Sequence, residues 1–152
     1  MNSSPGVLFL CVANSARSQM AEGIARKLAP AGTAVASAGS SPSQVNPLAI
    51  AAMSEIGIDI SDQRSTAVAD VDPNAVGTVI TLCAEEVCPA FLGAAERHHW
   101  PMPDPAAVPA DGPDGRERAL AEFRRVRDQL YARIAVFFGH AAMPDASATP
   151  AD

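Results

Sequence analysis

The sequence predicts a single-domain α/β protein built on a parallel β-sheet. Its 152 residues are the length of one domain, and 48% of them are apolar against 18% charged, as in globular chains. The continuous apolar run at residues 7–12 is typical of a strand that is buried on both faces, and the β-branched and apolar residues at 77–82 predict a second strand. Helical patterns alternate with these runs, and this alternation favours a parallel sheet covered by helices on both faces.

The remaining elements follow from spacing and from stop signals. In chain order we expect a helix at residues 18–28, a strand at 33–38, a helix at 47–56 and a long final helix at 120–137. Asn46 and Pro47 mark the start of the second helix, because an N-cap side chain precedes a proline in the first turn. Residues 101–113 are rich in proline and aspartate and predict an ordered surface loop. We expect residues 1–143 to form the domain and residues 144–152 to be a disordered tail.

Charge and cysteine content limit the possible functions. A net charge of −6 disfavours a nucleic-acid or anionic-membrane surface, so any bound anion must be held by a local site. No stretch reaches the length of a membrane span, and the run at residues 7–12 lacks the basic flank of a signal peptide. We therefore expect a cytoplasmic monomer. In that reducing compartment, three cysteines are candidates for catalysis, redox chemistry or metal binding rather than for structural disulfides.

The strongest functional signal is the segment at residues 11–18, which reads Cys-Val-Ala-Asn-Ser-Ala-Arg-Ser. A cysteine at the end of a strand is followed by a short loop of small residues and then by a helix. This geometry directs successive backbone N–H groups and a helix N-terminus to one point, which suits an oxyanion. The residues expected to bind that oxyanion are Val12, Ala13, Asn14, Ser15, Ala16 and Arg17.

Three side chains of this segment have the chemistry of nucleophilic catalysis. A helix N-terminus and a guanidinium stabilise a thiolate at Cys11, and the Ser18 hydroxyl can donate a hydrogen bond to it. Arg17 can hold two anion oxygens at once, which lysine does less well. A nucleotide-binding P-loop is excluded, because the sequence has no Gly-x4-Gly-Lys-Ser/Thr run. The alternative is a buried cysteine at the end of a core strand, near an arginine on a helix surface.

These features resemble the thioredoxin-coupled arsenate reductases, which share their fold with the low-molecular-weight protein tyrosine phosphatases. The similar stretches span most of residues 7–130 in the same order: CVANSARSQMAEG, VASAG, VNPLAIAAM, IDIS, VITLC, HHWPMPDPA and EFRRVRDQL. The resemblance implies a four-stranded parallel sheet flanked by helices. It also implies an arsenate reductase in which Cys11 is the nucleophile, Arg17 and the loop amides form the oxyanion site, Ser18 stabilises the thiolate and Asp104 is the general acid. Without the resemblance, Asp104 would be interpreted as a turn residue between two prolines.

Cys83 and Cys88 match the two further redox cysteines of that family. Reduction of arsenate to arsenite takes two electrons, the number released when two thiols form a disulfide. In this relay Cys11 attacks arsenic, and Cys83 attacks the Cys11 sulfur and releases arsenite. Cys88 then attacks Cys83 and frees Cys11, and a reductant reduces the resulting Cys83–Cys88 disulfide. Thioredoxin is the expected reductant, and the Cys-x4-Cys spacing leaves glutaredoxin with glutathione, and mycothiol, as alternatives.

Other interpretations of these two cysteines remain open. They could be structural thiols, or they could bind zinc together with His98 and His99. The two histidines are poor co-ligands, because adjacent residues of a strand point to opposite faces. No cofactor or metal is expected. Some members of the family bind potassium at positions that match Asn14, Glu22 and Ser37, but a threonine stands at residue 66, where a carboxylate is expected, so we predict no such ion.

The main alternative function is a low-molecular-weight protein tyrosine phosphatase, or a small-molecule phosphatase, that uses Cys11, Arg17 and Asp104. Phosphatases of this fold typically have proline where this chain has Gln19, and an aromatic residue where it has Ala106. Both differences favour the reductase. A third possibility is a non-catalytic oxyanion or thiol sensor, for which the sequence shows no partner surface.

Overall fold

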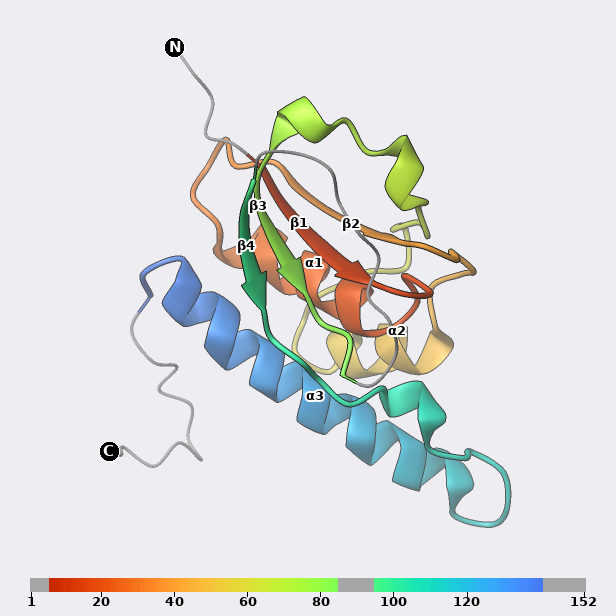
Figure 1. Cartoon of the computed structure of the whole chain (residues 1–152). Helices are drawn as coiled ribbons and strands as arrows, with labels where there is room; N and C mark the ends of the chain where they lie inside the picture. Colours follow the sequence, from red (N-terminus) through yellow and green to blue (C-terminus); the bar gives the residue numbers. More distant parts are fainter. Residues whose placement is uncertain (1–5, 85–94, 141–152) are drawn as a thin grey trace.

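The computed structural model describes residues 6–84 and 95–140, which form a four-stranded sheet in the order β2-β1-β3-β4 with every pair parallel (Figure 1). The strands are β1 (Gly6–Cys11), β2 (Val35–Gly39), β3 (Val76–Thr81) and β4 (Glu96–His99). This confirms the parallel sheet that the alternating pattern predicts and the four strands that the resemblance implies. Because β1 pairs with β2 on one side and β3 on the other, its carboxyl end is enclosed by two neighbouring strand ends.

The three α-helices lie together on one face of the sheet (Figure 1). They are α1 (Arg17–Leu28), α2 (Pro47–Ser54) and α3 (Gly115–Phe137). Phe9 and Ile80 point from the sheet into the larger core cluster, where they meet Met20 of α1 and Phe123 of α3. On the other face, the described residues contribute only the short 3₁₀ helices η1 (Val68–Asp70) and η2 (Pro73–Ala75). Val68 and the segment around it pack there against the smaller cluster, which contains Leu8, Leu10, Ala38 and Val79.

The sequence predicts some helix ends correctly and others not. Asn46 caps α2 as predicted, because its side chain accepts a hydrogen bond of 2.8 Å from the Leu48 amide. α3 starts at Gly115, earlier than the apolar spacing from Leu120 indicates. The apolar spacing misses this first turn because the turn carries exposed charged residues such as Glu117. A further 3₁₀ helix, η3 (Pro105–Ala107), lies inside the predicted loop at residues 101–113. The tail predicted at residues 144–152 lies outside the described residues.

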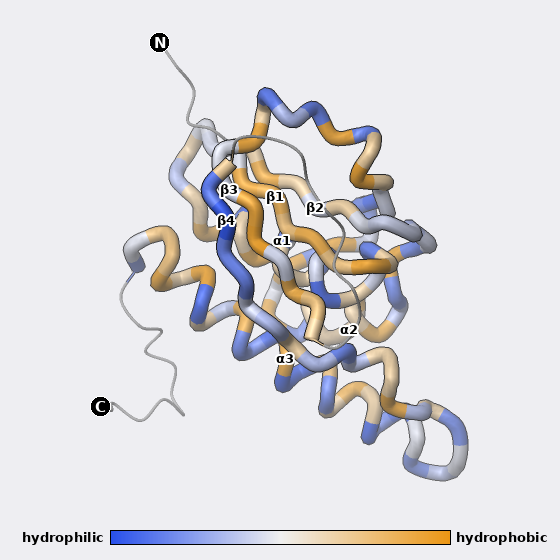
Figure 2. The backbone as a smooth tube through the Cα atoms, in the orientation of Figure 1, coloured by the Kyte–Doolittle hydropathy of each residue, from blue (hydrophilic) through white to orange (hydrophobic). Residues whose placement is uncertain are grey.

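Figure 2 shows why β4 carries no apolar signal: β1 and β3 are hydrophobic, whereas β4 at the sheet edge is hydrophilic. Its sequence is Glu-Arg-His-His. An edge strand needs no apolar face, and charged side chains there protect the open edge from pairing with other chains. β4 is therefore formed by its pairing with β3 rather than by a pattern of its own.

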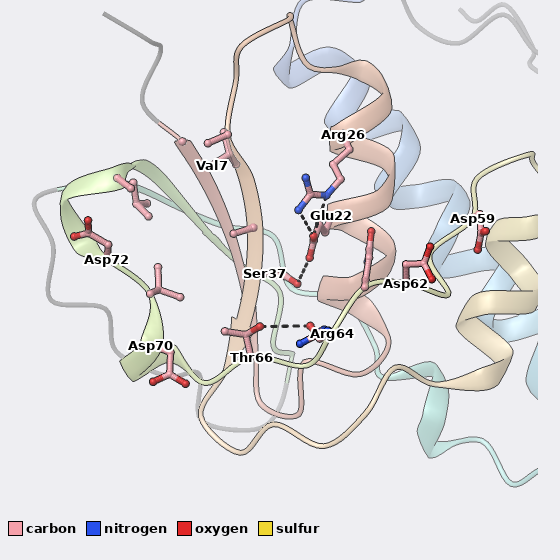
Figure 3. Close-up of a pocket in the computed structure, with 17 residues that line it drawn as sticks. Val7, Glu22, Arg26, Ser37, Asp59, Asp62, Arg64, Thr66, Asp70 and Asp72 are labelled. Atoms are coloured by element: carbon pink, nitrogen blue, oxygen red, sulfur yellow. Dashed lines mark hydrogen bonds and ion pairs between the residues drawn. The ribbon is translucent and has the colours of Figure 1, made fainter.

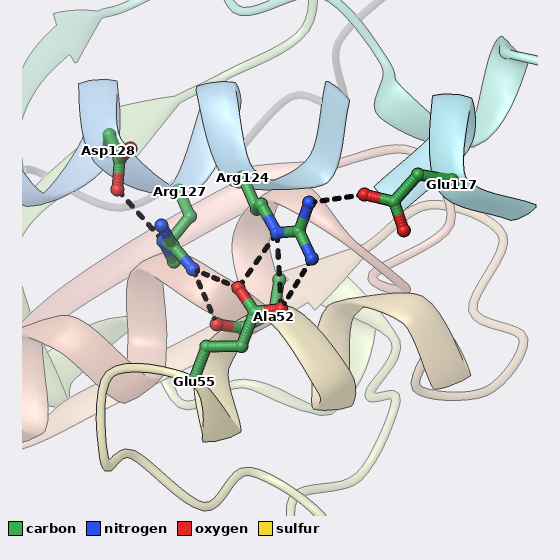
Figure 4. Close-up of polar contacts among 6 residues, drawn as sticks. All are labelled: Ala52, Glu55, Glu117, Arg124, Arg127 and Asp128. Atoms are coloured by element: carbon green, nitrogen blue, oxygen red, sulfur yellow. Dashed lines mark hydrogen bonds and ion pairs between the residues drawn. The ribbon is translucent and has the colours of Figure 1, made fainter. Parts of the chain in front are cut away.

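A carboxylate at the end of α2 ties that helix to α3. Glu55 accepts hydrogen bonds of 2.8–3.1 Å from Arg124 and one of 2.9 Å from Arg127 (Figure 4). The buried Arg127 guanidinium also donates to the Ala52 carbonyl at 2.8 Å. The hydrogen bonds from Arg124, and then from Arg127, hold the pKa of Glu55 below its ordinary value, while partial burial acts in the opposite direction. The contact therefore makes stability depend on pH.

We expect Glu55→Gln to lower the free energy of unfolding by about 1 kcal/mol at pH 7, since the carboxylate is partly exposed to solvent. The folded-state pKa is lowered, so the contribution is present above the unfolded pKa and is lost as pH falls through the folded pKa. The difference between parent and variant should thus shrink toward zero below about pH 4. Urea unfolding between pH 3 and 8 measures this, with Glu122→Gln as a control for a single surface pair. A pH-independent difference would show that Glu55 acts through packing alone.

Candidate active site

The segment between Cys11 and α1 is a loop whose carbonyls all point outward. Each carbonyl accepts a hydrogen bond from a donor outside residues 12–16: Val12 from the Ser41 amide (2.9 Å), Ala13 from the Ser43 amide (3.1 Å), Asn14 from the Gln19 side chain (3.0 Å), Ser15 from the Asn46 amide (2.9 Å) and Ala16 from the Met20 amide (2.9 Å). In a trans peptide the C=O and the N–H point in opposite directions, so the amides face the other side of the loop. Within the described parts of the chain, the amides of residues 13–16 donate to no acceptor. The arrangement suits an oxyanion at the N-terminus of α1.

Gly39, the last residue of β2, lies directly behind this loop. A Cβ atom at this position would lie 2.3 Å from the Val12 carbonyl oxygen and 2.9 Å from the Asn14 amide nitrogen. Both are backbone atoms, so the overlap could be relieved only by a shift of the loop itself. The loop geometry therefore depends on a residue without a side chain at the end of the neighbouring strand.

We expect Gly39→Ala to weaken phosphate binding at least about tenfold and to lower the free energy of unfolding by about 2 kcal/mol, because the forced shift acts on backbone atoms. Gly57→Ala is the matched control: Gly57 has φ +79°, so alanine is strained there by about 1 kcal/mol, yet nothing lies near its Cβ position. Calorimetric titration with phosphate and thermal unfolding of both variants check this. Unchanged phosphate affinity in Gly39→Ala would mean that the loop tolerates the displacement.

Asn14 adopts a left-handed backbone conformation at the centre of the loop, with φ 47°, and is fully buried. The orientation of its side-chain amide is fixed by its partners. The Thr66 backbone amide can only donate, and it donates to Asn14 Oδ1 at 2.7 Å. Asn14 Nδ2 therefore faces the other way and donates to Ser18 Oγ at 2.7 Å and to Ser37 Oγ at 2.9 Å.

This orientation determines where the two serine hydrogens point. Since each hydroxyl oxygen accepts from Asn14, each hydroxyl hydrogen is free to donate elsewhere. Ser37 donates to Glu22 Oε1 at 2.6 Å, and Ser18 is left to donate to Cys11 Sγ, 2.9 Å away. The arrangement thus directs a hydrogen-bond donor at the Cys11 sulfur, as the thiolate role of Ser18 requires. The Glu22 carboxylate is paired in turn with Arg26.

Arg17 and Asp104 lie beside one another at the edge of the loop. The Arg17 guanidinium is 4% exposed and donates to the carbonyls of Met102 at 3.1 Å and Leu82 at 3.4 Å. Its Nη2 lies 3.9 Å from Asp104 Oδ2. Asp104 Oδ1 accepts from the Ala106 amide at 3.0 Å and caps η3, which leaves Oδ2 facing Arg17. The Asp104 side chain is 41% exposed, so its carboxyl group is accessible from solvent.

Backbone pairing brings the segment that contains Cys83 next to the end of β1, where Cys11 lies. The Leu82 amide, one residue earlier, donates at 2.9 Å to the carbonyl of Leu10, the residue before Cys11. Cys83 is buried and takes part in a disulfide, whereas Cys11 is a buried free thiol. His98 pairs with Glu96, and His99 pairs with Thr81. Cys88 lies outside the described residues.

A separate cavity of about 670 Å³ lies along β2 and the segment at residues 59–76 (Figure 3). Its lining includes Glu22, which lies between Ser37 and Arg26 in Figure 3, but neither Cys11 nor Arg17. The cavity therefore reaches the Glu22 end of the hydrogen-bond chain and not the oxyanion loop.

Within residues 6–84 and 95–140, no three acidic, cysteine or histidine residues form a group that could hold a metal ion. In the same ranges, no helix has both the length and the apolar character to cross a membrane.

Comparison with known proteins agrees with this geometry. The family model described as low molecular weight phosphotyrosine protein phosphatase matches residues 6–144. The arsenate reductase of Halalkalibacterium halodurans is 47% identical over 133 residues, covering 86% of this chain and 93% of the relative. That of Bacillus subtilis is 41% identical with the same coverage. A solved structure, an arsenate reductase in the phosphate binding state, has a TM-score of 0.73 and 35% identity, covering 89% of this chain and 97% of its own.

The fold and the loop thus define a protein of the low-molecular-weight phosphatase type. Within that class, the chain belongs to the arsenate reductase family. Another solved relative, a thioredoxin-dependent arsenate reductase of Corynebacterium glutamicum, has a TM-score of 0.56 and 28% identity, covering 90% of this chain and 64% of its own. A tyrosine phosphatase of T. tengcongensis, with 23% identity and a TM-score of 0.69, shares the fold.

Proposed function

We propose that this protein reduces arsenate to arsenite with Cys11 as the nucleophile. The observation that carries the proposal is the fixed hydrogen-bond chain from Thr66 through Asn14 and Ser18, which points a donor at the Cys11 sulfur. The amides of residues 13–16 and the N-terminus of α1 provide partial positive charge at this end of β1, which suits an oxyanion and a thiolate nucleophile. The names of the relatives support arsenate as that oxyanion.

In the first step, the Cys11 thiolate attacks arsenic and a sulfur–arsenic bond replaces one arsenic–oxygen bond. Arg17 and the loop amides hold the remaining oxygens and stabilise the charge that develops on them. Asp104 protonates the oxygen that leaves, so that it departs as water. The 3.9 Å contact between Asp104 and Arg17 supports this role, because a carboxyl group beside Arg17 is next to the oxygens that Arg17 would hold.

In the second step, the Cys83 thiolate attacks the Cys11 sulfur. The electron pair of the sulfur–arsenic bond goes to arsenic, which leaves as arsenite, and a Cys11–Cys83 disulfide remains. Cys88 then attacks Cys83, frees Cys11 and forms a Cys83–Cys88 disulfide that an external dithiol reduces. The free Cys11 thiol beside a disulfide-bonded Cys83 supports this order, because it matches a state in which the nucleophile has been regenerated.

Thioredoxin is the proposed reductant, and the cytoplasm, which maintains reduced dithiols, is the proposed compartment. The test is arsenite formation with purified protein and three separate systems: thioredoxin with its reductase, glutaredoxin with glutathione, and mycothiol. We expect sustained turnover with thioredoxin. Hydrolysis of p-nitrophenyl phosphate is measured in parallel. Phosphatase turnover without arsenite formation in any system would replace the reductase by the phosphatase that uses Cys11, Arg17 and Asp104.

A further inference from the structure

Gln19 lies in the first turn of α1 and is fully buried, although none of the catalytic steps above requires it. Its side-chain nitrogen donates to two backbone carbonyls, those of Asn14 at 3.0 Å and Arg64 at 2.9 Å. Backbone carbonyls can only accept, so both hydrogens of the amide nitrogen are used and the side-chain orientation is fixed. The oxygen of the same amide accepts from Gln63 Nε2 at 2.7 Å.

Gln63 supports Gln19 from the segment that follows α2. Its Nε2 donates both to the Gln19 side-chain oxygen and, at 3.0 Å, to the Gln19 backbone carbonyl. From the same segment, Ser65 Oγ donates to the Asn14 carbonyl at 2.5 Å. The Asn14 carbonyl thus receives two donors, one from α1 and one from residue 65, and the first of these is held by Gln63.

The Asn14 carbonyl matters because of the peptide to which it belongs. The same peptide carries the Ser15 amide, which points in the opposite direction, toward the inner side of the oxyanion loop. Asn14 also has a positive φ, a left-handed conformation that non-glycine residues seldom adopt and that asparagine adopts most readily among them. If the Gln19 donor is removed, only the Ser65 hydroxyl still holds this carbonyl. The peptide is then held less firmly, and any rotation of it turns the Ser15 amide away from the anion.

We propose that Gln19 is a positioning residue of the oxyanion loop, and that Gln63 holds it in place. Gln19 acts through the Asn14–Ser15 peptide and does not touch the substrate. The inference rests on the proposed function for the identity of the oxyanion. Position 19 is also one of the positions at which this chain differs from the phosphatases of the fold, which typically have proline there. A proline side chain has no donor for the Asn14 and Arg64 carbonyls.

The test compares Gln19→Met, which keeps the size of the side chain and removes its donors, with Gln63→Met and with Ile134→Val. Gln63 is only half-buried, so its variant should fold even if Gln19→Met does not. Ile134 is a buried core residue of α3, and its variant controls for general destabilisation. Phosphate affinity is measured by calorimetric titration, arsenate KM and kcat by arsenite release, and stability by thermal unfolding.

We expect Gln19→Met to weaken phosphate binding and to raise the arsenate KM about tenfold or more, since a buried carbonyl loses a donor. Gln63→Met should show the same direction with a change of about threefold, and Ile134→Val should change Tm only. Parent-like phosphate affinity in both glutamine variants would overturn the inference. The inference would also be overturned if Ile134→Val lost as much phosphate affinity as the two glutamine variants for the same decrease in Tm. Weakened phosphate binding in a protein that forms no arsenite would uphold the inference and overturn the proposed function.

Discussion

Replacing Cys11 by serine is expected to abolish arsenate reduction, with a loss of at least about 10³-fold. A serine hydroxyl is not an anion at neutral pH, so the hydrogen bond from Ser18 and the dipole of α1 have no thiolate to stabilise. The variant also lacks the sulfur that Cys83 must attack, so no later step can restore turnover. Arsenite release under excess reductant measures the effect.

The same variant gives a direct control for the fold of the site. The loop amides and Arg17 do not depend on the Cys11 sulfur for their positions, since the loop carbonyls are held by Ser41, Ser43 and Asn46. Cys11→Ser should therefore bind phosphate within about threefold of the parent. Activity above a few per cent of the parent would exclude Cys11 as the nucleophile.

The sequence is sufficient for the parts of the site that are local in the chain. Cys11, Arg17 and Ser18 lie within one strand–loop–helix unit, so their spacing alone predicts that they share a site. The same holds for the start of α2, because the cap at Asn46 and the proline after it are adjacent residues. These predictions need no knowledge of which distant segments pack against the loop.

The rest of the site depends on contacts between segments that no periodicity reveals. Thr66 fixes the Asn14 side chain from 52 residues away, and Ser37 completes that network from the neighbouring strand. Gln63 lies 44 residues from Gln19 in the chain. A sequence pattern shows that such residues are polar, but it does not show that they form hydrogen bonds to the same loop or to the side chains that support it. Gly39 is similar, because only the approach of β2 to the loop shows why a side chain is excluded there.

Outside the loop, Cys88→Ser is expected to reduce one equivalent of arsenate and then stop. Cys11 and Cys83 together supply the two electrons that convert arsenate to arsenite, so the first turnover needs no third thiol. The product is a Cys11–Cys83 disulfide next to the oxyanion loop. Cys11, at the end of β1, and Cys83, two residues after β3, are both buried in the structure, so we expect an external dithiol to have poor access to a disulfide between them.

A rapid-quench assay with the thioredoxin system should show a burst of about one arsenite per enzyme, followed by a stall. Cys83→Ser is the matched control, and it should give no burst, because nothing attacks the Cys11 sulfur once arsenic is bound. The two variants separate the step that releases arsenite from the step that regenerates Cys11. Steady turnover of Cys88→Ser at the parent rate would remove Cys88 from the mechanism and would mean that the reductant attacks the Cys11–Cys83 bond directly.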